Sequence, residues 1–425
     1  MNDKMGYHHI PQVFFLFITF LTGALPVRSV PTFIELLIGA MLTQAGFVTQ
    51  AWIAINMHRH WTSYYKWLQK GKWSWVALGC RMAKLVSIFF PAQERLLIID
   101  DTIIFRSSKK APGSKIHHQH GNKPNRPTYV RGQSWVSLAA VAEHSSTVTA
   151  IPLLSRMMRR CGNTSKLDAA KVLIRTILPA LATDNVCLLT DSWYMRSKLI
   201  LFALAKGIHV IGQVRRDTAL YDIPKRTGKK GRPRKYGDKY TPERVAILPE
   251  TRTKMFLYGK QQRIRYKSIV VKARFIKGNQ VRSVWVRFED DNGNLMKERL
   301  ILSTNTDLSP CEIITTYAKR WCIENMFGQM KNSWGWKEAW QQTRQVLHRW
   351  TQILSIAYAI PQLLALKGGK KINALSILTP WRQNKCVTAG QVRLGLKRIL
   401  GHVRVREWWN PKSRKFEPPD QSFCT

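Results

Sequence analysis

Two continuous aliphatic runs along the chain end in acidic residues. Segment 95–102, RLLIIDDT, ends with Asp100 and Asp101 before Thr102, and segment 185–192, NVCLLTDS, ends with Asp191. Short apolar runs bounded by polar residues are typical of fully buried strands, and carboxylates at strand ends project at a shared edge of a sheet. Taken alone, Asp101 could begin a turn and Asp191 could cap the helix that follows.

The remaining pattern predicts helices first and then an α/β order. Residues 1–93 contain apolar-rich stretches of helical character, including 31–42 and 47–57. After the first strand come a polar excursion at 106–132 and then alternating strands and helices. We predict strands at 134–141 and 147–153, a helix at 165–181, the strand that ends in Asp191, a helix at 195–206 and a fifth strand at 209–214.

A long interval separates the fifth strand from the next clear helix, since Asp191 and Glu324 are 133 residues apart. A bare connection of this length is implausible in a compact domain, so the interval must have structure of its own. Alternating segments at 265–275, 281–288 and 299–302, with a turn at 291–294, predict a β-rich insertion.

A helix is predicted after this insertion. Ser309, Pro310 and Glu312 have the spacing of an N-cap, an N1 proline and the partner of a capping box. The helix carries a Y-x2-R-x3-E-x6-K pattern formed by Tyr317, Arg320, Glu324 and Lys331. At about 100° per residue, all four fall within an arc of about 60° on one face. An exposed face with an Arg320–Glu324 pair, worth a few tenths of a kcal/mol, is the plainer interpretation of the helix alone.

With both strand-end acids, the helix motif resembles the DDE transposases of bacterial insertion sequences that carry the Y-R-E-K signature. The resemblance rests on IIDDT, LLTDSWY and YAKRWCIENMFGQMK, and it covers about residues 95–331. It implies a ribonuclease-H-like catalytic core, an insertion that holds the transposon end, and a homodimer on DNA that holds two ends together.

The resemblance also implies the site. Asp100, Asp191 and Glu324 would be catalytic and would hold two Mg²⁺ ions, with Mn²⁺ as a possible substitute. Mg²⁺ prefers oxygen ligands, and a pair of ions can activate the attacking oxygen and stabilise the leaving one in an in-line displacement. Tyr317, Arg320 and Lys331 would then bind neighbouring phosphates of DNA.

Two positions need a choice. Family members carry D-x-T after the first strand, which selects Asp100, but a one-residue slip in register would select Asp101. Relatives often have histidine in the second strand, where this chain has Gln133, so a proton-handling role is not expected there.

Composition agrees with a nucleic-acid partner. The chain has 68 Lys and Arg against 25 Asp and Glu, a net charge of +43, and 45% hydrophobic residues in 425. Such a charge indicates a polyanion, and the apolar content indicates a large core in two or three domains. Ribosomal and DNA-coating proteins are also basic but rarely combine this charge with 16 Trp.

Three further segments are candidates for DNA contact. Arg232 and Arg234 in GRPR could enter a narrow minor groove or belong to a solvated basic linker. Trp285 could stack on an unpaired base, although a strand tryptophan is more often buried. His117, His118 and His120 lack matching metal-ligand spacing, so DNA contact is favoured over metal binding.

The seven cysteines form no C-x2-C pair, which favours a reducing compartment and disfavours a zinc site. The apolar run 13–25 resembles the core of a signal peptide, but little positive charge precedes it and no A-x-A site follows. It is also shorter than the roughly 20 residues that span a bilayer. We therefore expect a bacterial cytoplasmic, nucleoid-associated protein without a membrane partner.

The sequence thus predicts five regions: a helical DNA-end-binding domain (1–93), the first part of the core (94–214), a basic linker with the β-rich insertion (215–306), the Glu-bearing part of the core (307–366) and a basic C-terminal region (367–425). Three functions remain open. They are a transposase that nicks the ends and joins them to target DNA, a nuclease without joining, and a non-catalytic DNA-binding derivative.

Overall fold

The computed structural model describes residues 7–118, 127–144, 147–158, 166–183, 185–225, 233–375 and 386–419. They form two compact units. Unit 1 comprises Met1–Ala92, Asp101–Ala182 and Glu324–Thr425, and unit 2 comprises Gln93–Asp100 and Thr183–Ile323. The predicted ranges 94–214 and 307–366 therefore each contribute to both units, and the division into five regions stays a prediction.

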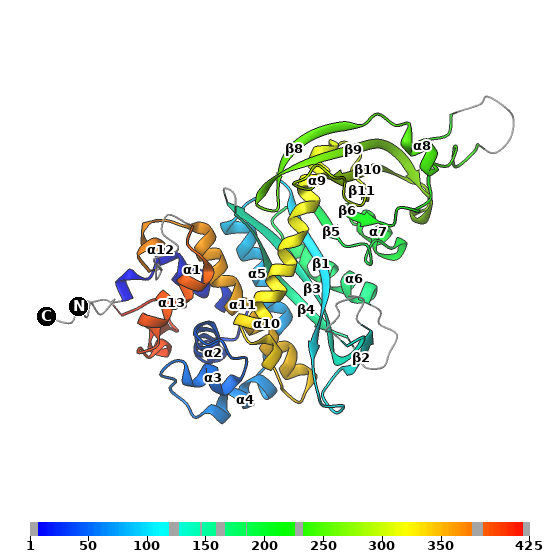
Figure 1. The fold of residues 1–425 in the computed structure, drawn as a ribbon. Coiled ribbons are helices and arrows are strands. Elements are labelled where there is room, and N and C mark those ends of the chain that lie inside the picture. The colour runs from blue at the N-terminus through cyan, green and yellow to red at the C-terminus, as the bar shows by residue number, and fades with distance from the viewer. Residues whose placement is uncertain are drawn as a thin grey trace. The chain divides into compact units, whose positions relative to one another are not determined.

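Unit 1 begins with the expected N-terminal helices (Figure 1). The signal-like apolar run forms α1, whose Phe14, Phe17 and Leu21 are fully buried, and α1 packs against α5. The apolar run is therefore part of the core of this unit. No helix within the described residues has the length and apolar character needed to cross a membrane. The N-terminal elements are η1 Tyr7–His9, α1 Gln12–Thr22, η2 Val27–Ser29, α2 Val30–Leu42, α3 Val48–Ile53, α4 Trp61–Lys70 and α5 Trp75–Phe89.

The strands of unit 1 centre on a long antiparallel hairpin, β3 Tyr129–His144 and β4 Thr147–Met157. Strand β2, Ser114–His118, pairs with β3, so the excursion predicted at 106–132 contains a strand that the polar pattern concealed. Helices α5, α6 (Lys166–Ile177, followed by η3 Leu178–Ala180) and α11 pack against β3 and β4. Unit 1 is therefore a helical layer built on a hairpin.

The C-terminal part of unit 1 is helical. Helix α11, Arg344–Lys367, is almost wholly buried, and it contacts α2, α4, α5 and α13. Helix α13 spans Ala389–Leu400. The other elements are η6 Trp336–Glu338, α12 Lys370–Leu375, η8 Val405–Trp408, β12 Trp409–Asn410 and β13 Lys415–Phe416.

Two buried arginines of unit 1 bind main-chain carbonyls. Arg106 donates to the oxygens of Lys337 at 2.6 Å and Ala339 at 2.7 Å. Arg349 donates to four carbonyls that follow or end α4, those of Leu68, Gln69, Gly71 and Trp73, at 2.7 to 3.5 Å. A cation beside these orphan carbonyls satisfies the end of a helix that has no capping side chain of its own.

Unit 2 is a mixed sheet. Strand β1, Arg95–Phe105, runs from unit 2 into unit 1, and its first residues pair in parallel with β5, Val186–Thr190. The order continues from β5 through β6 (His209–Val214), β11 (Arg299–Ser303), β10 (Asn279–Phe288), β9 (Lys260–Ala273) and β7 (Leu220–Tyr221), with β8 (Thr251–Leu257) paired to β9. Strands β1, β5 and β6 are parallel, whereas β11 is antiparallel to β6.

The β-rich segment predicted between the fifth strand and the next helix extends this same sheet through the β6–β11 pair. Strand β8 was not predicted, because its residues alternate weakly and are mostly exposed. The elements are β6 His209–Val214, β7 Leu220–Tyr221, α8 Pro242–Ala246, β8 Thr251–Leu257, β9 Lys260–Ala273, η4 Arg274–Ile276, β10 Asn279–Phe288 and β11 Arg299–Ser303, with helix α7 Ser197–Leu204 between β5 and β6.

The helix predicted after the insertion is interrupted. It consists of α9 Pro310–Ala318, a 3₁₀ turn η5 Lys319–Trp321, and α10 Cys322–Ser333. The capping box of Ser309 and Glu312 is confirmed. Since a 3₁₀ turn advances about 120° per residue, the 60° arc expected for an unbroken helix does not extend across η5.

Candidate active site

Asp100 and Asp191 occupy equivalent positions on neighbouring strands of unit 2. Ile99 of β1 is the register partner of Thr190 of β5, and each aspartate is the next residue. Partners in parallel strands about 4.8 Å apart project to the same face, so the two acids stand at one level of the sheet. Asp191 directly follows the last residue of β5, as predicted, whereas β1 continues to Phe105, so Asp100 lies within its strand and not at its end.

Arg320 pairs with Asp100. Its Nη1 lies 3.2 Å from Oδ2 of Asp100, and each side chain is only 12% exposed. Tyr317 is 8% exposed and its side chain hydrogen-bonds with Arg320. Burial raises the pKa of Tyr317, while the nearby Arg320 guanidinium partly offsets the rise. Asp191 also acts on the pKa of Tyr317 and raises it. Unit 2 therefore gathers Asp100, Asp191, Tyr317 and Arg320 in one neighbourhood.

The carboxylate of Asp191 is oriented by its own turn. Its Oδ1 accepts the backbone N–H groups of Trp193 at 3.1 Å and Tyr194 at 3.0 Å. This is the capping contact that the sequence allowed as a plainer role. The contact is compatible with a ligand role, because it fixes the direction of the carboxylate.

Asp101 has a different partner from Asp100. Lys166 Nζ lies 2.6 Å from its Oδ2, and both residues belong to unit 1. Successive residues of a strand project to opposite faces, so Asp100 and Asp101 lie on opposite faces of β1. Only Asp100 shares a strand level with Asp191.

Glu324 and Lys331 lie in unit 1, on α10. Glu324 is exposed in the first turn of this helix, where a negative charge is favoured, and Lys331 is in its last turn. Of the three predicted catalytic acids and the three predicted phosphate-binding residues, Asp100, Asp191, Tyr317 and Arg320 are thus in unit 2, and Glu324 and Lys331 are in unit 1.

The donor set of unit 2 suits a hard divalent cation. Two aspartates at one strand level offer the oxygen ligands that Mg²⁺ prefers, and substrate phosphate with water can complete such a shell. Across the part of the chain that the structure describes, no group of three or more His, Cys, Asp or Glu side chains forms a ready-made metal site.

The other candidates for DNA contact have different outcomes. Trp285 is 5% exposed in the middle of β10, with Lys267 and Leu300 as its register partners, which agrees with the buried alternative. Its contact with DNA stays a prediction. Arg234 is exposed, whereas Arg232 lies outside the described residues.

Gln133 and His117 each make a hydrogen bond within unit 1. Gln133 is buried on β3, where its Nε2 donates to the Pro112 carbonyl at 2.7 Å. His117 and His118 lie on β2, and His120 falls outside the described residues. His117 has a ring nitrogen 3.1 Å from the Gly132 carbonyl, and burial lowers its pKa.

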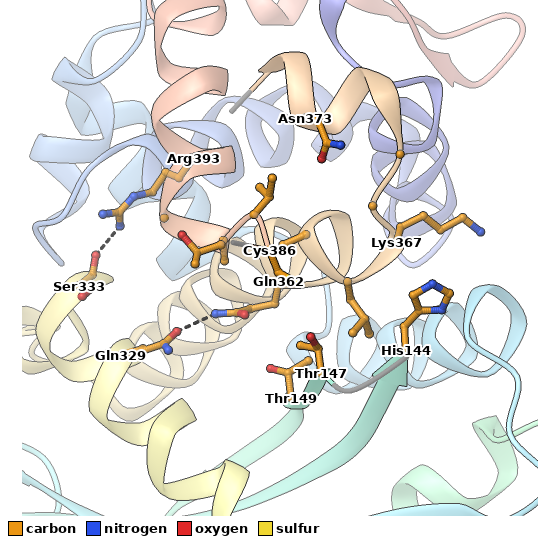
Figure 2. Close-up of a pocket in the computed structure, with 18 of the residues that line it drawn as sticks. His144, Thr147, Thr149, Gln329, Ser333, Gln362, Lys367, Asn373, Cys386 and Arg393 are labelled. Atoms are coloured by element: carbon orange, nitrogen blue, oxygen red, sulfur yellow. Dashed lines mark hydrogen bonds between the residues drawn. The ribbon is translucent and has the colours of Figure 1, made fainter. Parts of the chain in front are cut away.

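A hollow of about 1050 Å³ lies in unit 1, at the end of α10 (Figure 2). Gln329 pairs with Gln362 at 2.6 Å across it, and Arg393 donates to the Ser333 carbonyl at 2.5 Å. Its described lining includes no Asp or Glu. The described part of this lining therefore supplies no carboxylate.

Sequence reasoning missed Tyr258. It is 48% exposed at the turn between β8 and β9, with φ 55° followed by Gly259 at φ 83°. Two-residue turns of this kind usually carry Asn-Gly or Asp-Gly, so a tyrosine is costly there. Tyr258 also acts on the pKa of Tyr317. Because β8 was not predicted from the sequence, the Tyr258-Gly259 pair could not be identified as a turn between two strands.

Comparison with known proteins identifies the family. The family model described as "DDE superfamily endonuclease" matches residues 32–267, more than half of the chain. The chain belongs to the DDE superfamily endonucleases, a membership that implies a ribonuclease-H-like core and suggests nuclease activity. The match ends before Glu324, so it contains Asp100 and Asp191 but not the acid of α10.

Other comparisons add less. No curated protein matches the chain. Among solved structures, the chain is similar to the NurA nuclease from Sulfolobus solfataricus, with 11% identity, coverage of 54% of this chain and 73% of that chain, and a TM-score of 0.25.

Proposed function

We propose that this protein is a DNA transposase that nicks the ends of a mobile element and joins the freed 3′-hydroxyls to target DNA. The observation that carries the proposal is the pair of aspartates at one level of parallel strands β1 and β5, with Arg320 and Tyr317 beside them. Family membership, the charge of +43 and the chain order Asp100, Asp191, Glu324 support it.

In this proposal Asp100, Asp191 and Glu324 hold two divalent ions, Mg²⁺ or Mn²⁺. When bound, the ions activate the attacking oxygen and neutralise charge on the leaving oxygen. Asp191 presents a carboxylate already oriented by two backbone N–H groups. Arg320 pairs with Asp100, and its guanidinium is of the kind that binds phosphate oxygens of DNA.

The partners follow from the reaction. The substrate is double-stranded DNA, both the terminal inverted repeats and the target, and two ends require a homodimer. A bacterial cytoplasmic, nucleoid-associated location fits such a substrate. A nuclease without strand joining and a non-catalytic DNA-binding derivative are the alternatives, and the same experiment separates them.

The test uses supercoiled plasmid that carries the element's ends, purified protein and Mg²⁺. Nicks together with joined products support the transposase, and nicks alone indicate the nuclease. Retention of DNA without any cleavage indicates the non-catalytic derivative.

Substitutions then test the acids. Asp100→Asn, Asp191→Asn and Glu324→Gln should each lower cleavage by at least about a thousandfold, because a lost ligand removes stabilisation of charge in the transition state. DNA binding without metal should persist. Asp101→Asn and the exposed Asp307→Asn are matched controls that should retain cleavage. Loss of cleavage in Asp101→Asn with full activity in Asp100→Asn would reverse the assignment on β1.

A further inference from the structure

A hollow of about 430 Å³ lies in unit 1, between the first helices and the C-terminal hairpin. It shares no described lining residue with the hollow at the end of α10. Its walls come from α1, from the segment that leads into α2, from α5 and from the β12–β13 hairpin. The lining residues are Leu16, Thr19, Phe20, Thr22, Gly23, Leu25, Val27, Val30, Arg81, Phe89, Trp409 and Arg414.

Most of this lining is apolar. Leu16 and Val27 are 46% and 38% exposed, so large apolar side chains of this wall remain in contact with water. Phe20 and Phe89 pack edge to face, with ring centroids 6.2 Å apart. The Phe416 N–H donates to Thr19 Oγ1 at 2.9 Å and joins the hairpin to α1. The apolar wall is thus held in place, and burying it under a ligand would be favourable.

Arg81 brings an oriented positive charge to this wall. Its Nε donates to the Phe20 carbonyl at 2.7 Å, and its guanidinium carbon lies 3.8 Å from the centroid of the Phe20 ring. Among the described residues, Nη1 and Nη2 have no acceptor. A Cβ at Gly23 would lie 2.9 Å from Nη2, so the glycine leaves room for the guanidinium. A planar guanidinium with two such nitrogens matches the two oxygens of a carboxylate.

The hairpin adds a second cation and an unused donor. Arg414 is exposed in the hairpin turn, with φ 55°, a conformation that is uncommon for residues other than glycine. The indole N–H of Trp409 is buried and has no acceptor within the part of the chain that the structure describes, although buried donors are normally paired. The described lining contains no Asp or Glu that could neutralise the two arginines.

These walls restrict the class of ligand. Small-molecule sites measure about 300 to 1,000 Å³ and are mostly apolar with a few polar groups, as here. A DNA phosphate alone would leave the apolar wall in water, and an uncharged hydrocarbon would cover the guanidiniums without pairing them. A molecule that joins an apolar body to one carboxylate meets both requirements.

We propose that this hollow binds a small carboxylate with an apolar body, such as a medium-chain fatty acid. Its carboxylate accepts from Arg81 and Arg414, and its body lies against the aromatic rings of the wall. Because the ligand contacts both the first helices and the hairpin, it stabilises their packing. This inference concerns unit 1 and goes beyond the proposed reaction on DNA.

Isothermal titration calorimetry of the full-length protein, without DNA or divalent metal, compares three probes. Octanoate has the apolar body and the charge, octanol has the body alone, and acetate has the charge alone. We expect one octanoate per chain with a Kd of roughly 0.01 to 1 mM, a range set by the small size of the probe. Octanol should bind about tenfold more weakly, because the charge-assisted hydrogen bonds are lost. Acetate should not bind at these concentrations.

Variants on the helical side test the role of Arg81. Arg81→Met keeps an unbranched apolar chain and should weaken octanoate binding by about tenfold while octanol binding is retained. Retained octanol binding shows that the hollow is intact. Gly23→Ala keeps both charges but crowds Nη2 and should weaken octanoate binding by a smaller factor. If Arg81→Met does not fold, Gly23→Ala and the hairpin variant decide the question.

The hairpin variant has a matched control. Arg414→Asn, a residue that tolerates the left-handed conformation, should weaken octanoate binding severalfold. The exposed Lys412→Asn, in the same turn but outside the lining, should bind octanoate as wild type does. The proposal is overturned if octanol or acetate binds wild type as tightly as octanoate does. It is also overturned if octanoate does not bind, or if Lys412→Asn weakens binding as much as Arg414→Asn.

Discussion

Arg349 in unit 1 and Arg320 in unit 2 are both largely buried cations, but they bind different partners. Among the residues that the structure describes, Arg349 donates to main-chain carbonyls around the end of α4. Arg320 faces the carboxylate of Asp100 beside Tyr317. The first arrangement completes the hydrogen bonds of the fold, whereas the second keeps a charged pair that a phosphate or a metal can rearrange. The net charge of the chain therefore overstates the number of positive side chains that are available to DNA.

The largest expected effect is on stability. Arg349→Ala should lower the free energy of unfolding by about 4 kcal/mol, because the carbonyls around the end of α4 lose the buried guanidinium that donates to them. Urea denaturation measures the change, and Arg349→Lys should recover part of it. A decrease in the free energy of unfolding below about 1 kcal/mol would show that Arg349 contributes no more to stability than an exposed arginine does.

His348, the neighbour of Arg349, provides a pH test of unit 1. Burial lowers its pKa from the ordinary 6.5 to about 4. Its Nε2 accepts the Met157 N–H at 3.2 Å, and Nδ1 lies 2.7 Å from the Arg344 carbonyl. Protonation of Nε2 would place two donors against each other.

Because the folded pKa is depressed, the unfolded chain binds more protons between about pH 6.5 and 4. The contribution of neutral His348 is complete above pH 6.5 and is lost as pH falls toward 4, by about 3 kcal/mol in all. Urea titrations at pH 7.5 and 5 should show this slope reduced in His348→Gln and unchanged in the exposed His402→Gln. Equal slopes in both variants would contradict the assignment.

Arg320→Ala should act on DNA more than on stability. We expect roughly tenfold weaker binding and a salt dependence reduced by about one unit, as for one lost phosphate contact. The exposed Arg252→Ala is the matched control and should change affinity less. If Arg320→Ala lowered stability as much as Arg349→Ala and left DNA binding intact, the distinction between the two arginines would fail.

The smallest effect is expected at Lys166. Its pair with Asp101 is partly exposed, at 32% and 15%, so Lys166→Met should cost less than about 1 kcal/mol in stability. Plasmid cleavage should be retained. A large loss of cleavage would show that the Asp101 face of β1 belongs to the reaction.

Local patterns predicted the parts of the fold that depend on local physics. The aliphatic runs that end in Asp100 and Asp191 became adjacent parallel strands, and the Ser309 capping box formed. An element stabilised by a distant partner was missed: strand β2 depends on its pairing with β3.

The site shows the same limit. Spacing identified Arg320, but only the fold shows that its partner is an acid 220 positions away. Likewise, nothing local marks Arg349 as structural, because its four acceptors are carbonyls of a segment some 280 residues earlier.

The path of the chain between the units has a practical consequence. The backbone passes from one unit to the other at 92/93, 100/101, 182/183 and 323/324, and the second passage separates Asp100 from Asp101 within β1. Neither unit is an uninterrupted stretch of sequence, so no simple truncation can produce one alone. A fragment that begins at residue 183 would lack the strand that pairs with β5 and with it Asp100. A premature stop anywhere before residue 324 would remove most of α10 and all that follows.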